Sequence, residues 1–124
     1  MQRAIPDIPT NSELSTHIVR EPAGVRLLLR GELDMNGVLE AERAVEASAA
    51  LVPGGGRLTI DVAELEFMDL FGARVLLRTA DSALTPEREV VIANPRGHVR
   101  RLFELITDLA RGRSLVTELV RPVG

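Results

Sequence analysis

Three aspartates are the side chains whose spacing first suggests chemistry in this sequence. Asp34, Asp61 and Asp69 each lie at or near the expected end of a strand. Ligand sites of open α/β sheets gather beyond the carboxyl ends of the strands, and carboxylates grouped there could bind Mg²⁺. Aspartate also caps helices and stabilises turns, and the spacing of these three favours that structural role. An enzyme or small-ligand domain that uses magnesium or a nucleotide is therefore the less favoured alternative.

The absence of other reactive residue types and motifs excludes most catalytic mechanisms. The chain has no cysteine, and all 15 of its basic residues are arginine, so thiolate nucleophiles, Cys-based zinc sites and catalytic lysines are absent. His17 and His98 have no metal-ligand spacing around them, and no G-x-S-x-G motif is present. The glycines at 54–56 follow an expected helix and precede a strand, whereas phosphate-binding loops need the opposite order. We therefore expect no catalytic residue, no metal and no cofactor.

Length and composition predict one cytoplasmic domain. A chain of 124 residues with 45% hydrophobic and 27% charged residues is typical of a single globular domain. No apolar run approaches the ~20 residues of a membrane span, and the N-terminus lacks the apolar stretch of a secretory signal. We therefore expect a cytoplasmic protein without membrane insertion. The net charge of −3 and the 2% aromatic content argue against a nucleic-acid partner.

Hydrophobic periodicity predicts alternating strands and helices that position the aspartates. Residues 1–12, which include two prolines, are expected to form a flexible N-terminal arm. The expected elements are strands over 14–20 and 25–30 joined by a turn at 21–24, a helix capped by Asn36, a strand over 57–62, a helix after Asp69, a strand over 89–93, a helix that Gly112 ends, and a strand over 114–120. The order β-β-α-β-α-β-α-β predicts an α/β fold in which helices pack on a mixed, mostly parallel sheet with an antiparallel edge.

Two bulky apolar residues at the expected start of the second helix need an explanation. Leu70 and Phe71 follow Asp69 and lie outside the main apolar stripe of that helix. The entry to a helix usually carries small polar residues. Large apolar side chains at this position are either buried plugs of the core or an exposed contact for another molecule. The sequence alone does not decide between these two roles.

Three segments together resemble STAS domains, and specifically the SpoIIAA-like anti-sigma factor antagonists. Residues 31–34, Gly-Glu-Leu-Asp, look like the family's G-E-L-D before its first helix. Residues 58–72 are similar to its strand, loop and D-S-S-G helix start, and residues 94–109 to its P-x-V-x-x-L-F segment. The resemblance implies a STAS domain over 13–120 with a short tail at 121–124. The family's fold has the same element order as the one expected from the periodicity.

The resemblance implies a binding switch and not an enzyme. In this family the unphosphorylated antagonist binds an anti-sigma factor that is also a kinase, and thereby frees a sigma factor for transcription. The kinase phosphorylates the first serine of D-S-S-G, and the complex dissociates. Asp69 and Gly72 match that motif, but Leu70 and Phe71 occupy both serine positions. Neither side chain has a hydroxyl group, so the usual phospho-acceptor is missing and the protein is expected to stay in its binding-competent form.

The resemblance also implies where the partner binds. The expected contact surface joins the loop after the second strand to the start of the second helix, and it consists of Asp34, Met35, Asn36, Asp69, Leu70, Phe71 and Gly72. The expected partner is a kinase-type anti-sigma factor. The alternative is a STAS scaffold recruited to another signalling assembly or to a transporter-associated complex. In that case Leu70 and Phe71 could serve a new interface, including one for homo-oligomers.

Overall fold

The computed structural model describes residues 13–109 and 120–121. The elements are, in chain order, β1 (Leu14–Glu21), β2 (Gly24–Leu33), α1 (Val38–Ala49), β3 (Gly56–Met68), α2 (Leu70–Ala83), β4 (Arg88–Ala93), α3 (Gly97–Leu109) and β5 (Val120–Arg121). This order confirms the predicted β-β-α-β-α-β-α-β fold. The N-terminal arm at 1–12, the helix end at Gly112, most of the expected last strand (114–119) and tail residues 122–124 lie outside the described residues.

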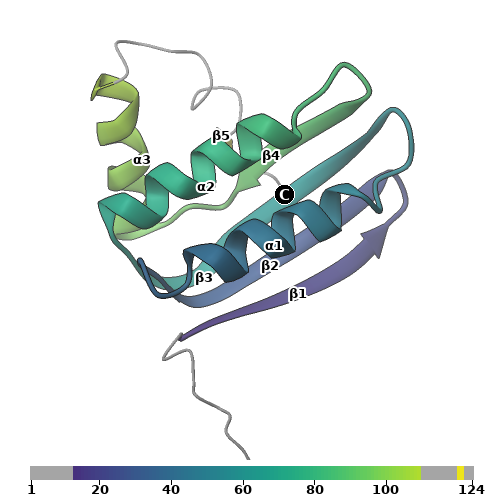
Figure 1. Cartoon of the computed structure of the whole chain (residues 1–124). Coiled ribbons are helices and arrows are strands. Elements are labelled where there is room, and N and C mark those ends of the chain that lie inside the picture. The colour runs from purple at the N-terminus through teal and green to yellow at the C-terminus, as the bar shows by residue number, and fades with distance from the viewer. Residues whose placement is uncertain (1–12, 110–119, 122–124) are drawn as a thin grey trace, which may run out of the picture.

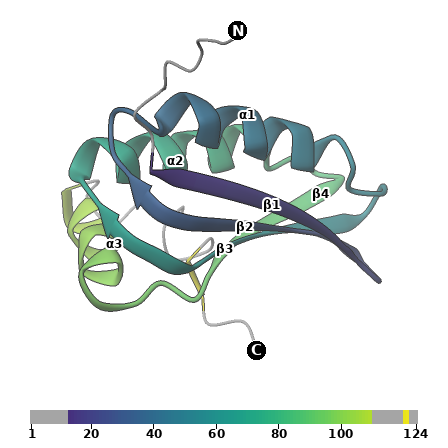
Figure 2. The same cartoon turned by 90° about the horizontal axis from the view of Figure 1, so that it is seen from below.

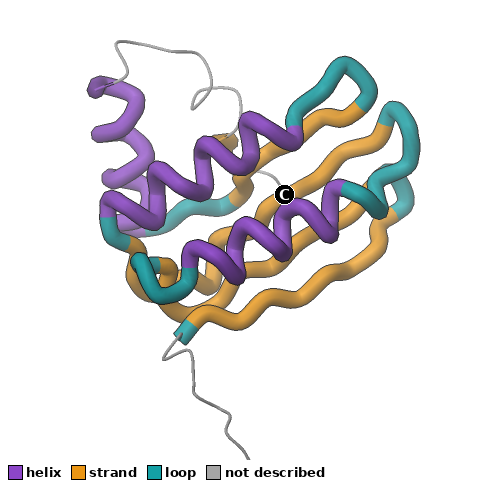
Figure 3. Tube along the Cα trace, viewed as in Figure 1, coloured by secondary structure: helices purple, strands orange, loops and turns teal. Residues whose placement is uncertain are grey.

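The strands form one mixed sheet in which neighbours in sequence are neighbours in space. The sheet order is β1-β2-β3-β4-β5, and only the β1–β2 pair is antiparallel. Each parallel pair is connected through a helix, as parallel strands require. Helices α1 and α2 lie side by side over the sheet, and α3 lies at the end where α2 begins (Figures 1 and 2). Figure 3 separates the purple helices from the orange strands beneath them.

The core lies between the sheet and the helices α1 and α2. Alternate residues of β2 and β3 point into it, among them Leu27, Leu29, Leu58 and Ile60, and all four are fully buried. This alternation is what a strand with one covered face produces. The helices present mostly alanine and valine to the sheet, so their backbones can approach it closely.

Strand β3 is longer than its sequence predicts. The periodicity indicated a strand over 57–62, but β3 continues to Met68 because β2 also continues to Leu33 and supplies a hydrogen-bonding partner along that length. The pairing shifts register beside Gly31, whose φ of +99° suits glycine far better than other residues. The predicted end of this strand was therefore wrong, because the partner strand lies far away in sequence.

The residue that begins α1 also differs from the prediction. Gly37 is the N-cap of α1, and no side chain caps that helix end. The backbone N–H of Asn36 instead donates to Asp34 Oδ1 over 3.0 Å. Asn36 therefore lies inside the turn and does not cap the helix.

Arg88 ties the other end of both helices to the sheet. Its Nε donates to the carbonyl oxygen of Ala83 over 2.8 Å, and its Nη1 donates to that of Ala49 over 3.3 Å. These carbonyls belong to the last turns of α2 and α1, where intrahelical donors are lacking. A cation at this position also interacts favourably with the negative ends of the helix dipoles.

Candidate functional site

The structure brings the two predicted halves of the binding surface together. The backbone N–H of Asp69 donates to the carbonyl oxygen of Leu33 over 3.3 Å, which joins the end of β2 to the start of α2. Gly72 packs against the same residue, so closely that a Cβ at position 72 would collide with the Leu33 backbone. The loop at 34–36 and the helix start at 69–72 therefore lie side by side at one end of the sheet (Figure 1). We call these seven residues the end surface.

Asp69 gives α2 a well-defined beginning. Its backbone is extended, and its Oδ1 accepts a hydrogen bond of 2.7 Å from the N–H of Gly72. Such a side-chain cap satisfies one of the N–H groups that a helix start leaves without an intrahelical partner. Because Asp69 and Gly72 are both held by hydrogen bonds and packing, the residues between them start from a rigid backbone.

Leu70 and Phe71 are exposed and are not plugs of the core. The exposed fractions are 37% for Leu70, 50% for Phe71 and 67% for Met35 on the adjoining loop. The structure thereby excludes the buried-plug alternative for these two side chains. Large apolar side chains grouped at one place on a small domain commonly mark a protein-binding surface.

Sequence reasoning missed two residues beside the end surface. Phe67, at the end of β3, is 43% exposed, and its ring lies 5.7 Å from the ring of His98. His98 Nε2 accepts a hydrogen bond of 3.1 Å from the N–H of Met68, so the start of α3 is attached to the end of β3. Phe67 thus adds an apolar ring to the same end of the molecule. The only sequence signal for this contact was the histidine at the expected start of the third helix. A histidine there does not show which residues it will contact.

The three aspartates do not converge on one point. Asp34 accepts from the backbone of its own turn, and Asp69 caps α2. Asp61 lies on β3, where it pairs with Arg26 over 2.7 Å and accepts a hydrogen bond of 3.4 Å from Asn94. Within residues 13–109 and 120–121, no group of three or more His, Cys, Asp or Glu side chains could hold a metal ion. The structure thus gives each of the three carboxylates a hydrogen-bonding role within the protein.

In the part of the chain that the structure describes, no helix has both the length and the apolar character needed to cross a membrane.

Solved structures of several proteins share this fold. An anti-sigma factor antagonist from Mycobacterium paratuberculosis superposes with a TM-score of 0.67 at 23% identity, covering 89% of this chain and 86% of that one. The anti-sigma factor antagonist SpoIIAA of Bacillus, in its unphosphorylated form, gives 0.59 at 18% identity, with 89% of each chain covered. The murine anion transporter Slc26a9 gives 0.56 at 17% identity, covering 85% of this chain and only 17% of that one.

Sequence comparison gives the family. No curated protein matches the chain significantly. A family model described as "Mlab, STAS domain" matches residues 16–117, which is most of the chain and includes the whole end surface. The chain therefore belongs to the STAS domain family.

Proposed function

We propose that this STAS domain is a protein-binding regulator of the anti-sigma factor antagonist type and not an enzyme. In this proposal the end surface binds a kinase-type anti-sigma factor and so influences transcription that depends on the sigma factor concerned. The observation that carries the proposal is the exposure of Leu70 and Phe71 on a capped helix start that adjoins the loop with the exposed Met35. The fold that the chain shares with two anti-sigma factor antagonists supports the same kind of role.

The chemistry of the end surface supports binding without release by phosphorylation. A phosphate group adds a charge of about −1.5 to −2 and three acceptor oxygens, which would disrupt an apolar contact. Leu70 and Phe71 have no hydroxyl group to receive it, and an uncharged side chain resembles the unmodified state more closely than the phosphorylated one. The kinase partner therefore has no means of dissociating the complex by modifying these two positions.

Rigidity and apolar area favour a stable complex. Apolar anchors near the centre of an interface carry a large share of binding energy. The Asp69 cap and the Gly72 contact hold the helix start in place before binding, so little backbone ordering is needed when a partner arrives. Preorganisation of this kind increases affinity because less conformational freedom is lost.

Substitution of Phe71 tests the proposal directly. Phe71→Asp should weaken binding to the kinase-type anti-sigma factor from the source organism at least tenfold in titration calorimetry, because a charge replaces an apolar anchor. Leu51→Asp is the matched control, since Leu51 is also an exposed apolar residue (39%) but follows α1 at the other end of the sheet. Equal affinity for the wild type and Phe71→Asp would count against the end surface as the binding site.

Restoring the two hydroxyl groups tests the lost switch. The double substitution Leu70→Ser with Phe71→Ser recreates the family's motif beside Asp69 and Gly72. We expect the captured kinase and ATP to add one phosphate to this variant, detected by mass spectrometry, and none to the wild-type helix start. Phosphorylation of the wild-type protein between residues 69 and 82 would contradict the proposal, because Thr79 and Ser82 would then provide a replacement switch.

A second candidate function is that of a scaffold in a transporter-associated complex. The presence of this fold inside the anion transporter Slc26a9 favours it. The same end surface would then bind a transporter subunit or a second copy of the chain. Sedimentation at several concentrations tests the second possibility, and a strictly monomeric mass at every concentration would rule out the homo-oligomer.

A further inference from the structure

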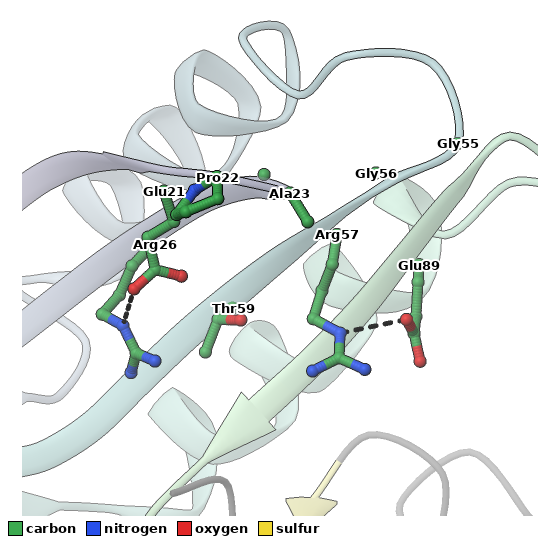
Figure 4. A pocket seen from close by; sticks show the side chains of 10 residues that line it. Glu21, Pro22, Ala23, Arg26, Gly55, Gly56, Arg57, Thr59 and Glu89 are labelled. Atoms are coloured by element: carbon green, nitrogen blue, oxygen red, sulfur yellow. Dashed lines mark hydrogen bonds and ion pairs between the residues drawn. The ribbon is translucent and has the colours of Figure 1, made fainter.

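A cavity lies at the opposite end of the sheet from the end surface. It has a volume of about 410 Å³ and is bordered by the β1–β2 turn, the loop before β3, and the first residues of β3 and β4. Its lining residues on the strands alternate with core residues such as Val25, Leu58 and Val90, so the cavity opens on the face turned away from α1 and α2 (Figure 4). A volume of this size suits a small ligand.

Thr59 gives the cavity a polar group without a hydrogen-bond partner. Its exposed fraction is 2%, and among the described residues its hydroxyl group makes no hydrogen bond. A buried hydroxyl group without a partner is unfavourable, and in native proteins each such group calls for an explanation. Thr59 lies opposite Arg26 on the neighbouring strand, and Figure 4 places it between the side chains of Arg26 and Arg57.

The two arginines already satisfy the carboxylates that line the cavity. Arg26 Nε donates to Glu21 over 2.7 Å, and its Nη1 donates to Asp61, also over 2.7 Å. The hydrogen bond to Glu21 is the largest of the effects that raise the pKa of Arg26, which keeps this side chain charged. Arg57 Nε donates to Glu89 over 3.0 Å. Donor groups without a described partner remain on both arginines, namely the two Nη groups of Arg57 and Nη2 of Arg26.

The ion pair of Arg57 is weak enough to be exchanged. Both side chains are well exposed, at 41% for Arg57 and 47% for Glu89, and exposed pairs of this kind contribute little to stability. A guanidinium group forms two parallel hydrogen bonds with a carboxylate or a phosphate group. Arg57 can therefore turn toward a ligand without a large loss elsewhere.

We propose that this cavity binds a small oxyanion, a carboxylate or phosphate group, through Arg57, Nη2 of Arg26 and the hydroxyl group of Thr59. Because each of these three side chains can donate a hydrogen bond, the ligand supplies the acceptors. The apolar side chains of Pro22 and Ala23 at its border suit a short carbon chain next to the anionic group. The site shares no residue with the end surface, so it stands or fails independently of the proposed partner.

Thermal unfolding with two probe anions tests the site. Inorganic phosphate and succinate are each titrated against the full chain, with sodium chloride at matched ionic strength as the reference. At ten times its Kd, a ligand that binds only the folded state raises the Tm by about 5 °C. Phosphate and carboxylates also stabilise proteins generally by exclusion from the surface, so the comparison between variants decides the result.

Two variants with matched controls distinguish a specific anion-binding site from the general stabilisation of the folded state by salts. Arg57→Gln and Thr59→Val should each weaken the response to the probe about tenfold. Arg30→Gln removes a similar exposed ion pair outside the cavity, and Thr79→Val removes a hydroxyl group that is already bonded to the Val75 carbonyl. Both controls should respond like the wild type. The same shift in all five proteins, or no shift with either anion, would overturn the proposal.

Thr59→Val provides a readout that needs no ligand. Because the hydroxyl group has no described partner, its removal should raise the Tm of the free protein by about 4 °C, while the anion response falls. A lower Tm would show that the hydroxyl group is satisfied in the free protein and would contradict the argument. A response to phosphate alone would assign the site to phosphate esters, and a response to succinate alone would assign it to carboxylates.

Discussion

Replacing Gly72 with alanine tests the contact that joins the two halves of the end surface. A Cβ atom at this position would lie 3.0 Å from the Leu33 carbonyl carbon and 3.1 Å from Leu33 Cγ, and closer still to the carbonyl oxygen. Carbon atoms in ordinary contact lie about 3.5–4.0 Å apart. The start of α2 and the end of β2 must therefore separate by at least about 0.5 Å to accept the methyl group.

The size of the effect follows from what this separation disrupts. Overpacking of a well-packed contact costs about 1–3 kcal/mol. The same movement weakens the hydrogen bond between Asp69 and Leu33, which contributes about 1 kcal/mol. Alanine regains less than about 1 kcal/mol through its higher helix propensity. The net expectation for Gly72→Ala is a free energy of unfolding lower by about 2 kcal/mol.

Urea unfolding followed by circular dichroism measures this change. With a slope of about 2 kcal/mol/M, the midpoint of Gly72→Ala should fall by about 1 M. Gly54→Ala is the matched control, because a Cβ there has nothing within 4 Å and should change stability by less than about 0.5 kcal/mol. If both variants unfold at the same urea concentration, the contact between Gly72 and Leu33 is not the constraint that we infer.

Substitutions at three further positions test the contacts that stabilise the fold. Asp69→Ala removes the cap of α2 and should lower the free energy of unfolding by about 1 kcal/mol, whereas Asp69→Asn should retain most of the stability; urea midpoints distinguish the two. Arg88→Ala leaves carbonyls at the ends of both α1 and α2 without their cationic donor, so thermal unfolding should show a loss of about 2 kcal/mol. Arg26→Met leaves Asp61 largely buried without its cation and should cost about 3 kcal/mol. Because the pKa of Arg26 is raised, its contribution is present at all pH values below its ordinary pKa and declines only as the pH rises through the raised value. The loss in Arg26→Met, measured by urea unfolding, should therefore be the same at about pH 7 and about pH 10.

Local patterns were sufficient to predict the kind and order of the elements. The apolar stripe of α2, for example, repeats at the spacing of a helix from Ala73 to Ala80, and these residues face the sheet. Such patterns arise from the geometry of one segment against one covered face, so they are visible without knowledge of the rest of the chain. The three segments that resemble STAS domains likewise predicted that the loop at 34–36 and the helix start at 69–72 lie together, and the contacts between Leu33, Asp69 and Gly72 show this arrangement.

Element boundaries depended on distant partners. The acidic residues after Val62 gave no strand signal, yet this stretch belongs to β3 because β2 pairs with it. Asn36 is a residue type that is common at helix N-caps, but the turn that Asp34 forms makes Gly37 the N-cap of α1. In the first case pairing with a distant strand outweighed local preference, and in the second a hydrogen bond to the Asp34 side chain within the turn did so.

The sequence by itself determined the fold class, the family resemblance and the absence of a hydroxyl group at Leu70 and Phe71. Only the tertiary structure decided that these two side chains are exposed, that Phe67 lies against His98, and that Thr59 is buried and has no hydrogen-bond partner among the described residues. The physical reason is that exposure and hydrogen bonding depend on which groups cover a residue. Those groups come from other strands and helices, whose positions are established only when the chain has folded.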